Sequence, residues 1–168
     1  MKIAFLILFT SLISQILFSQ DEIIIPESNT NSTMLVGEFK RELLQHNEFG
    51  QLFMEEYLNY HPDMEIINKF QHRIYNYSIT IVLATWCHDS QIQVPRFFKI
   101  LDKIDYNTNF VRIVCVDKDK TGGETDISNL NLELVPTFIF YKNDAEMGRI
   151  IESPINTLEA DILSILNE

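Results

Sequence analysis

The chain has 168 residues, and its 24 acidic side chains outnumber the 13 basic ones to give a formal charge of -11 at pH 7. This acidity argues against nucleic acid and anionic membrane surfaces as partners, because both carry negative charge themselves. With 46% hydrophobic residues, the length suits one globular domain with one core, preceded by a short leader.

Residues 1–19 have the pattern of a signal peptide. Lys2 supplies a positive start, Ile3–Phe9 form an apolar run, and the small Ser19 precedes a polar stretch. Cleavage after Ser19 predicts an exported protein, periplasmic or extracellular, with no membrane association once the leader is removed. An uncleaved membrane anchor is the alternative, although polar residues interrupt the run and leave it shorter than the ~20 apolar residues of a spanning helix.

Residues 20–36 are predicted to form a flexible tether, because the polar run Ser28–Thr33 has little to bury. Residues 37–61 are predicted to form a helical N-terminal addition, since their apolar side chains recur at three- and four-residue spacing. A second helix is expected to open at Pro62, with acidic residues in its first turn. Its apolar stripe comprises Met64, Ile67, Phe70 and Ile74.

The rest of the chain alternates strands and helices. The β-branched run at 78–85 predicts a buried strand, followed by a helix over 88–104 that Pro95 should kink. A second buried strand is expected at 110–116, then a loop over 118–134 with a short helical turn near 127–130. A hairpin over 137–152 and a helix over 158–166 complete an α/β fold, with a mixed central sheet and helices on both faces.

The chain contains two cysteines in different settings. Cys87 follows a strand and opens a helix, so it faces the unpaired N–H groups and the positive end of that helix, which favour a thiolate. Cys115 lies inside a buried strand and is expected to be an inert thiol. A structural Cys87–Cys115 disulfide, or Cys115 as an internal resolving thiol, is the alternative.

The segment Trp86–Ser90, with the sequence WCHDS, resembles the WCxxC active site of the thioredoxin superfamily. Pro95 resembles the proline of the family's active-site helix, and Val135–Thr137 resembles its cis-proline loop. The resemblance implies a thioredoxin-like three-layer fold over 37–168, with residues 37–61 as an addition to the minimal fold.

The same resemblance implies roles for the residues of the motif. Cys87 is expected to be the nucleophile, with the hydroxyl of Ser90 stabilising its thiolate. The residues expected to contact the substrate are Trp86, His88, Val135 and Pro136. No metal is expected, because the four histidines show no tight ligand spacing, and the chemistry needs no cofactor.

Two departures from the family narrow the expected chemistry. Ile81 replaces the buried aspartate that serves proton transfer in thioredoxins, and Ser90 replaces the second cysteine. The prediction is monothiol thiol–disulfide exchange, reductase- or isomerase-like, with protein or small-molecule thiols and disulfides as partners. A non-catalytic binding module that uses the same groove is the alternative. A thiol peroxidase fits less well, because Thr85 lies two residues before Cys87 rather than three.

Overall fold

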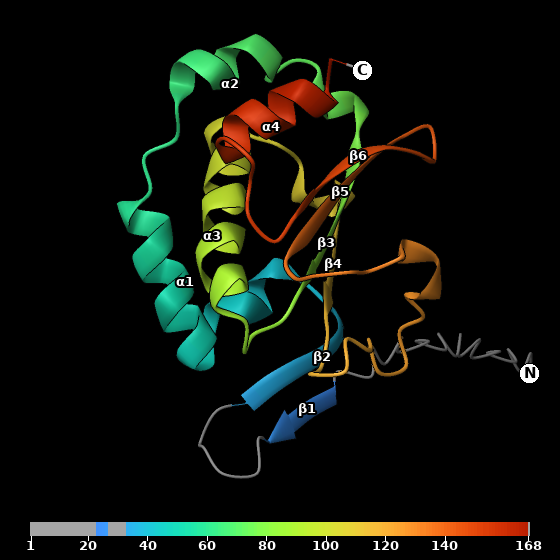
Figure 1. Cartoon of the computed structure of the whole chain (residues 1–168). Helices are drawn as coiled ribbons and strands as arrows, with labels where there is room; N and C mark the ends of the chain where they lie inside the picture. The colour runs from blue at the N-terminus through green and yellow to red at the C-terminus, as the bar shows by residue number, and fades with distance from the viewer. Residues whose placement is uncertain (1–22, 27–32, 168) are drawn as a thin grey trace, which may run out of the picture.

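A mixed sheet runs through the molecule, with the α-helices stacked on one side of it (Figure 1). The computed structural model describes residues 23–26 and 33–167, so the predicted signal peptide at 1–19 lies outside the described residues. The strand order is β1-β2-β4-β3-β5-β6, in which β3 and β4 are parallel and the other neighbours are antiparallel. The strands are β1 (Ile23–Pro26), β2 (Thr33–Phe39), β3 (Ser78–Leu83), β4 (Val111–Cys115), β5 (Thr137–Lys142) and β6 (Ala145–Ile151). The helices are α1 (Asn47–Asn59), α2 (Met64–Phe70), α3 (His88–Lys103) and α4 (Leu158–Ile165), with short 3-10 helices η1 (Arg41–Gln45), η2 (Ile74–Asn76), η3 (Thr108–Phe110) and η4 (Ser128–Leu130).

Strand β3 lies in the middle of the sheet, between β4 and β5. Its β-branched residues suit a pleated position that is buried on both sides. Because successive side chains of a strand point to opposite faces, Ile81 and Leu83 belong to one core while Val82 belongs to another. All three side chains are fully buried.

The face of the sheet that the helices cover carries the larger core. Phe97 of α3 stacks on Phe138 of β5 with ring centroids 4.5 Å apart. Helix α1 packs outside α3, where Phe53 and Phe98 approach to 6.0 Å between centroids. This helix-face core includes Phe53, Phe70, Ile81, Leu83, Phe97, Phe98, Leu101, Ile113, Cys115, Phe138, Phe140 and Ile162.

The opposite face carries a smaller core under a loop. Among the described residues, its cover is η4 and the chain on either side of it rather than an α-helix (orange in Figure 1). The predicted α/β architecture with a mixed central sheet is confirmed, whereas the helical cover predicted for this second face consists of a single 3-10 turn, η4. The loop-face core consists of Val82, Ala84, Val116, Leu130, Val135 and Ile139.

The N-terminal part of the domain corrects two of the predicted boundaries. Residues 23–26 and 33–36, predicted to be tether, lie in strands, and β2 extends to Phe39 and pairs with β4. The predicted helical addition at 37–61 therefore begins as strand, continues through η1 and becomes α-helical only at Asn47. The physical reason is burial, because Leu35, Val36 and Phe39 are each at most 5% exposed in β2, which lies between β1 and β4.

Smaller boundary shifts follow from capping. Helix α2 begins at Met64 rather than Pro62, because the Asp63 carboxylate caps it by accepting from the N–H groups of Glu65 and Ile66. Pro95 lies inside α3 as predicted. Within 23–26 and 33–167, no helix has both the length and the apolar character needed to cross a membrane.

Candidate functional site

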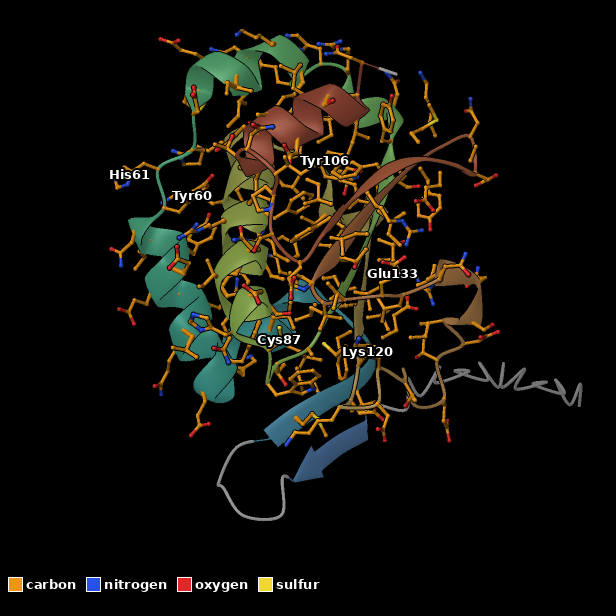
Figure 2. The ribbon with its side chains drawn as sticks, in the orientation of Figure 1. Tyr60, His61, Cys87, Tyr106, Lys120 and Glu133 are labelled. Atoms are coloured by element: carbon orange, nitrogen blue, oxygen red, sulfur yellow. The ribbon has the colours of Figure 1, made fainter. Side chains whose placement is uncertain are left out.

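Cys87 is the N-cap residue of α3, at the lower end of that helix in Figure 2. Its own N–H donates to the Ala84 carbonyl at 3.0 Å, and its carbonyl accepts from the N–H of Gln91 at 3.1 Å. These bonds form the tight turn from β3 into α3 and leave the side chain half-buried. The thiol therefore lies at the N-terminus of the helix, the place predicted from the strand-to-helix transition.

The Cys87 thiol donates to the carbonyl oxygen of Val135 at 3.2 Å. The Val135–Pro136 peptide bond is cis, and both residues are buried immediately before β5. Positions separated by 48 residues in the chain are thus in direct contact. Three of the predicted site residues meet at this point.

Ser90 lies one turn into α3 and is fully buried. Its hydroxyl oxygen accepts from the N–H of Ala84 at 3.2 Å, which ties the first turn of the helix back to the end of β3. The predicted donation from Ser90 to the Cys87 thiolate stays a prediction. The side-chain amide of Gln91 also donates to the Thr85 carbonyl at 3.0 Å, and no pattern in the sequence predicted this second hydrogen bond.

The remaining predicted residues lie on either side of the thiol. The half-buried Trp86 donates its indole N–H to the Val116 carbonyl at 3.3 Å, so the ring is held over the end of β4. His88 is exposed in the first turn of α3. Asp117 follows Val116 and forms a local turn: burial alone would raise the pKa of its carboxyl, but hydrogen bonds from Thr121 and Asp119 outweigh this and lower it.

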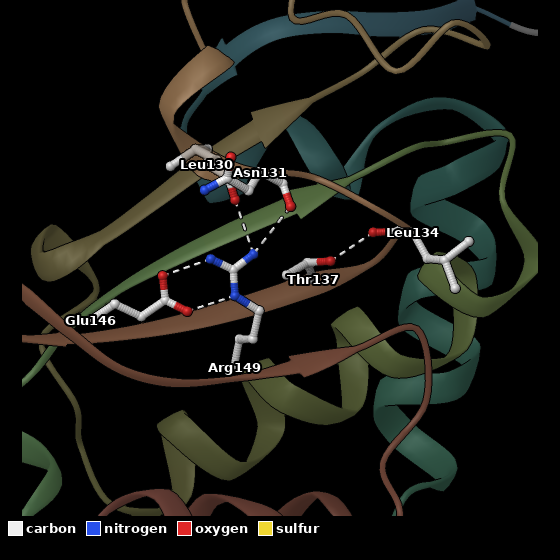
Figure 3. A network of polar contacts seen from close by, with 6 residues as sticks. All are labelled: Leu130, Asn131, Leu134, Thr137, Glu146 and Arg149. Atoms are coloured by element: carbon white, nitrogen blue, oxygen red, sulfur yellow. Dashed lines mark hydrogen bonds and ion pairs between the residues drawn. The ribbon is translucent and has the colours of Figure 1, made fainter.

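Sequence reasoning missed the way in which the chain before Pro136 is held. Side chains from several parts of the chain donate to carbonyl groups within residues 130–135, which we call the 130–135 segment (Figure 3). Because each donor comes from a different part of the chain, no local pattern could have revealed the set. The donors are Arg149 to Leu130 (2.9 Å) and Asn131 (3.5 Å), Lys120 to Glu133, Thr137 to Leu134 (2.6 Å) and Cys87 to Val135 (3.2 Å).

Cys115 has a different environment from Cys87. It is fully buried in the helix-face core, and burial raises the pKa of its thiol. Both cysteines are free, so the alternative of a structural Cys87–Cys115 disulfide is wrong. Cys87 instead packs against the loop-face core, on the other side of the sheet.

Two grooves on the surface lie away from Cys87. A groove of about 430 Å³ runs beside β2, η1 and the start of β4, and another of about 340 Å³ lies between β6 and α4. Cys87 lines neither groove. In the part of the chain that the structure describes, no group of three His, Cys, Asp or Glu side chains is arranged to hold a metal ion.

Comparison with known proteins gives resemblance in structure only. No protein-family model and no curated protein sequence matches the chain. A Pseudomonas aeruginosa protein of unknown function is 17% identical with a TM-score of 0.48, over 70% of this chain and 81% of its own. Thioredoxin O2 from Arabidopsis thaliana is 20% identical with a TM-score of 0.37, over 60% and 86% of the two chains. Fasciola hepatica thioredoxin is 15% identical with a TM-score of 0.38, over 62% and 90%.

Proposed function

We propose that this protein carries out monothiol thiol–disulfide exchange through Cys87, in an exported compartment. The observation that carries the proposal is the contact between the half-buried Cys87 thiol, at the N-terminus of α3, and the carbonyl before cis-Pro136. The N–H groups of the first turn have no helical partner and favour negative charge on that sulfur. The leader-like residues 1–19 are the reason for placing the reaction outside the cytoplasm.

The first step is attack of the Cys87 thiolate on one sulfur of a substrate disulfide. A bond forms between Sγ of Cys87 and that sulfur while the substrate S–S bond breaks. The other substrate sulfur leaves as a thiolate and takes a proton from solvent. Cys87 is thereby oxidised to a mixed disulfide, and one substrate sulfur is reduced to a thiol.

The second step needs a thiol from outside the protein. Ser90 offers a hydroxyl in place of a resolving thiol, and Cys115 is fully buried in the core on the other face of the sheet. A small-molecule thiol, or the substrate thiol released in the first step, attacks the mixed disulfide and frees Cys87. These two reaction steps suit disulfide isomerisation and exchange with small thiols better than full reduction of a protein disulfide.

Mass spectrometry after incubation with hydroxyethyl disulfide tests the first step. Cys115→Ala should form the mixed disulfide as fast as the native protein, whereas Cys87→Ala should form none while folded. If the native protein forms no adduct on Cys87 at neutral pH, exchange is not its function. A non-catalytic binding module that uses the same surface would then be the better description.

A gain-of-function variant tests the second step. Ser90→Cys places a thiol three residues after Cys87 and should reduce insulin disulfides with a dithiol as electron donor, which the native protein should not do. The variant that also carries Cys87→Ala is the control, and it should be inactive. Equal activity in native protein and Ser90→Cys would mean that the mixed disulfide is resolved in another way.

A further inference from the structure

Arg149 of β6 is held rigidly in front of the 130–135 segment. Its guanidinium forms two hydrogen bonds of 2.6 Å to the carboxylate of Glu146, and its side chain is only 19% exposed. A bidentate pair of this kind fixes the plane of the guanidinium as well as its position. The N–H groups left over point at the Leu130 and Asn131 carbonyls (Figure 3).

Arg149 binds the first residues of the 130–135 segment, and the last residue of that segment accepts the hydrogen bond from the Cys87 thiol. Asn131 has a left-handed backbone (φ 47, ψ 53) and follows η4 as its C-cap, so the chain changes direction there. Thr137 holds the Leu134 carbonyl at the other end of the stretch, next to Val135. With both ends held by side chains, the Val135 carbonyl has a fixed position opposite Cys87.

This position has a chemical consequence for Cys87. The bond from Sγ to the Val135 oxygen exists only while the thiol carries its proton, and a hydrogen bond to the protonated form disfavours the charged one. A carbonyl fixed at 3.2 Å therefore opposes the helix N-terminus, which favours the thiolate. Freeing that carbonyl should make Cys87 more reactive.

We propose that Arg149 is a positioning residue for Cys87: by holding the start of the 130–135 segment, it keeps the Val135 carbonyl against the thiol and restrains reaction until a substrate docks. A substrate backbone that pairs with this segment as an added strand would take over the Val135 carbonyl and release the restraint. The inference rests on the proposed function, because a restraint on the thiol matters only if the thiol reacts.

The test is the rate of Cys87 alkylation by iodoacetamide in Arg149→Met, with modification located by mass spectrometry. At pH 6 the rate should rise about threefold over the native protein, within the range expected for the loss of one neutral hydrogen bond. The difference between the two rates should shrink as the pH rises towards 10, because the bond from Sγ to the Val135 oxygen exists only in the protonated thiol. Arg149→Lys, which keeps a donor and the charge, should lie between the two. Four charged or titratable side chains belong to the first turn of α3 or to the 130–135 segment and its donors: His88, Asp89, Lys120 and Glu133. They are the same in every variant, so their effect on the alkylation rate cancels when two rates are compared.

Two variants control for charge and for the ion pair. Arg112→Met removes an arginine–glutamate pair of 2.8 Å to Glu38 on the same sheet, with no bond to the 130–135 segment, and should leave the rate unchanged. Glu146→Gln weakens the ion pair but keeps Arg149, and should change the rate by less than twofold. Cys115 is the internal reporter of unfolding, since it is fully buried.

Three results would overturn the inference. They are an unchanged rate in Arg149→Met, an equal rise in Arg112→Met, and a parallel rise in Cys115 labelling, which would mean a loss of overall stability. Failure of the proposed function is a separate result, because it would show as absence of exchange with hydroxyethyl disulfide in the native protein whatever the alkylation rates.

Discussion

The two faces of the sheet are built differently, although the same strands supply both. The helix-face core contains large aromatic side chains from α1, α3 and β5, and Cys115 lies fully buried among them. The loop-face core consists of aliphatic side chains under η4 and the 130–135 segment, and Cys87 packs at its margin. Cys115 pairs with Leu83 of β3 in the helix-face core, and Leu83 lies only a few residues before Cys87 in the chain.

The helix-face core therefore supplies most of the stability, and the loop face carries the more accessible thiol. A thick, well-packed cover excludes reagents and solvent from a thiol, and burial also raises the pKa of Cys115 and keeps it protonated. On the other face, a thin cover held by individual hydrogen bonds leaves the Cys87 thiol half-buried. Such a cover can rearrange when a substrate binds. The comparison predicts that substitutions on the two faces will have different consequences.

The largest effect is expected for Phe138→Ala in the helix-face core. Loss of a fully buried ring that stacks on Phe97 should lower the free energy of unfolding by about 3–5 kcal/mol. Leu130→Ala in the loop-face core should cost about 2 kcal/mol, because its side chain is smaller and its cover is a single turn that can settle into the gap. Urea unfolding measures both, and equal losses would contradict the contrast between the faces.

A smaller effect is expected where the two faces meet, at the turn from β3 to α3. Ser90→Ala leaves the N–H of Ala84 buried without its hydroxyl acceptor, which should cost about 1–3 kcal/mol. Ser164→Ala, on the exposed side of α4, is the matched control and should change stability by less than ~0.5 kcal/mol. Equal stability of the two variants would mean that Ser90 does not hold this turn.

The smallest effect is expected at the polar margin of the thick face, where Asp102 of α3 accepts two hydrogen bonds of 2.6 Å from Arg41 and one of 2.7 Å from Tyr57. Asp102→Asn should cost about 1–2 kcal/mol at pH 7, between the values for exposed and buried pairs. Burial alone would raise the pKa of Asp102, but the bonds from Arg41 and Tyr57 and the Arg41 charge outweigh it and lower the pKa.

The pH dependence of that difference has a definite sign. A lowered pKa in the folded state gives stability that is complete above the unfolded value of about 3.9 and is lost as the pH falls through the folded value. The gap between native protein and Asp102→Asn should therefore stay constant from pH 7 to about pH 5 and close at lower pH. Unfolding curves at several pH values measure it, and a gap that persists at pH 2 would show that the ion pair is not its source.

Much of the fold follows from local patterns in the chain. The β-branched run of β3, the apolar spacing of α3 and the hairpin of β5 and β6 were predictable because each pattern acts over a few residues. Strand β2 was not, because the burial of Leu35, Val36 and Phe39 depends on pairing with β1 along its first half and with β4 along its last residues, which no local pattern reveals. A run of polar residues next to it favoured a tether instead.

The sequence by itself determined that Cys87 opens a helix behind a buried strand, and that no second thiol stands three residues further on. Only the tertiary structure decided what faces that thiol. The Val135 carbonyl and its supports on Arg149, Lys120 and Thr137 come from parts of the chain that meet only when the sheet has formed. The physical reason is that backbone carbonyls carry no residue identity: every position has one, and which of them receives a donor depends on packing alone.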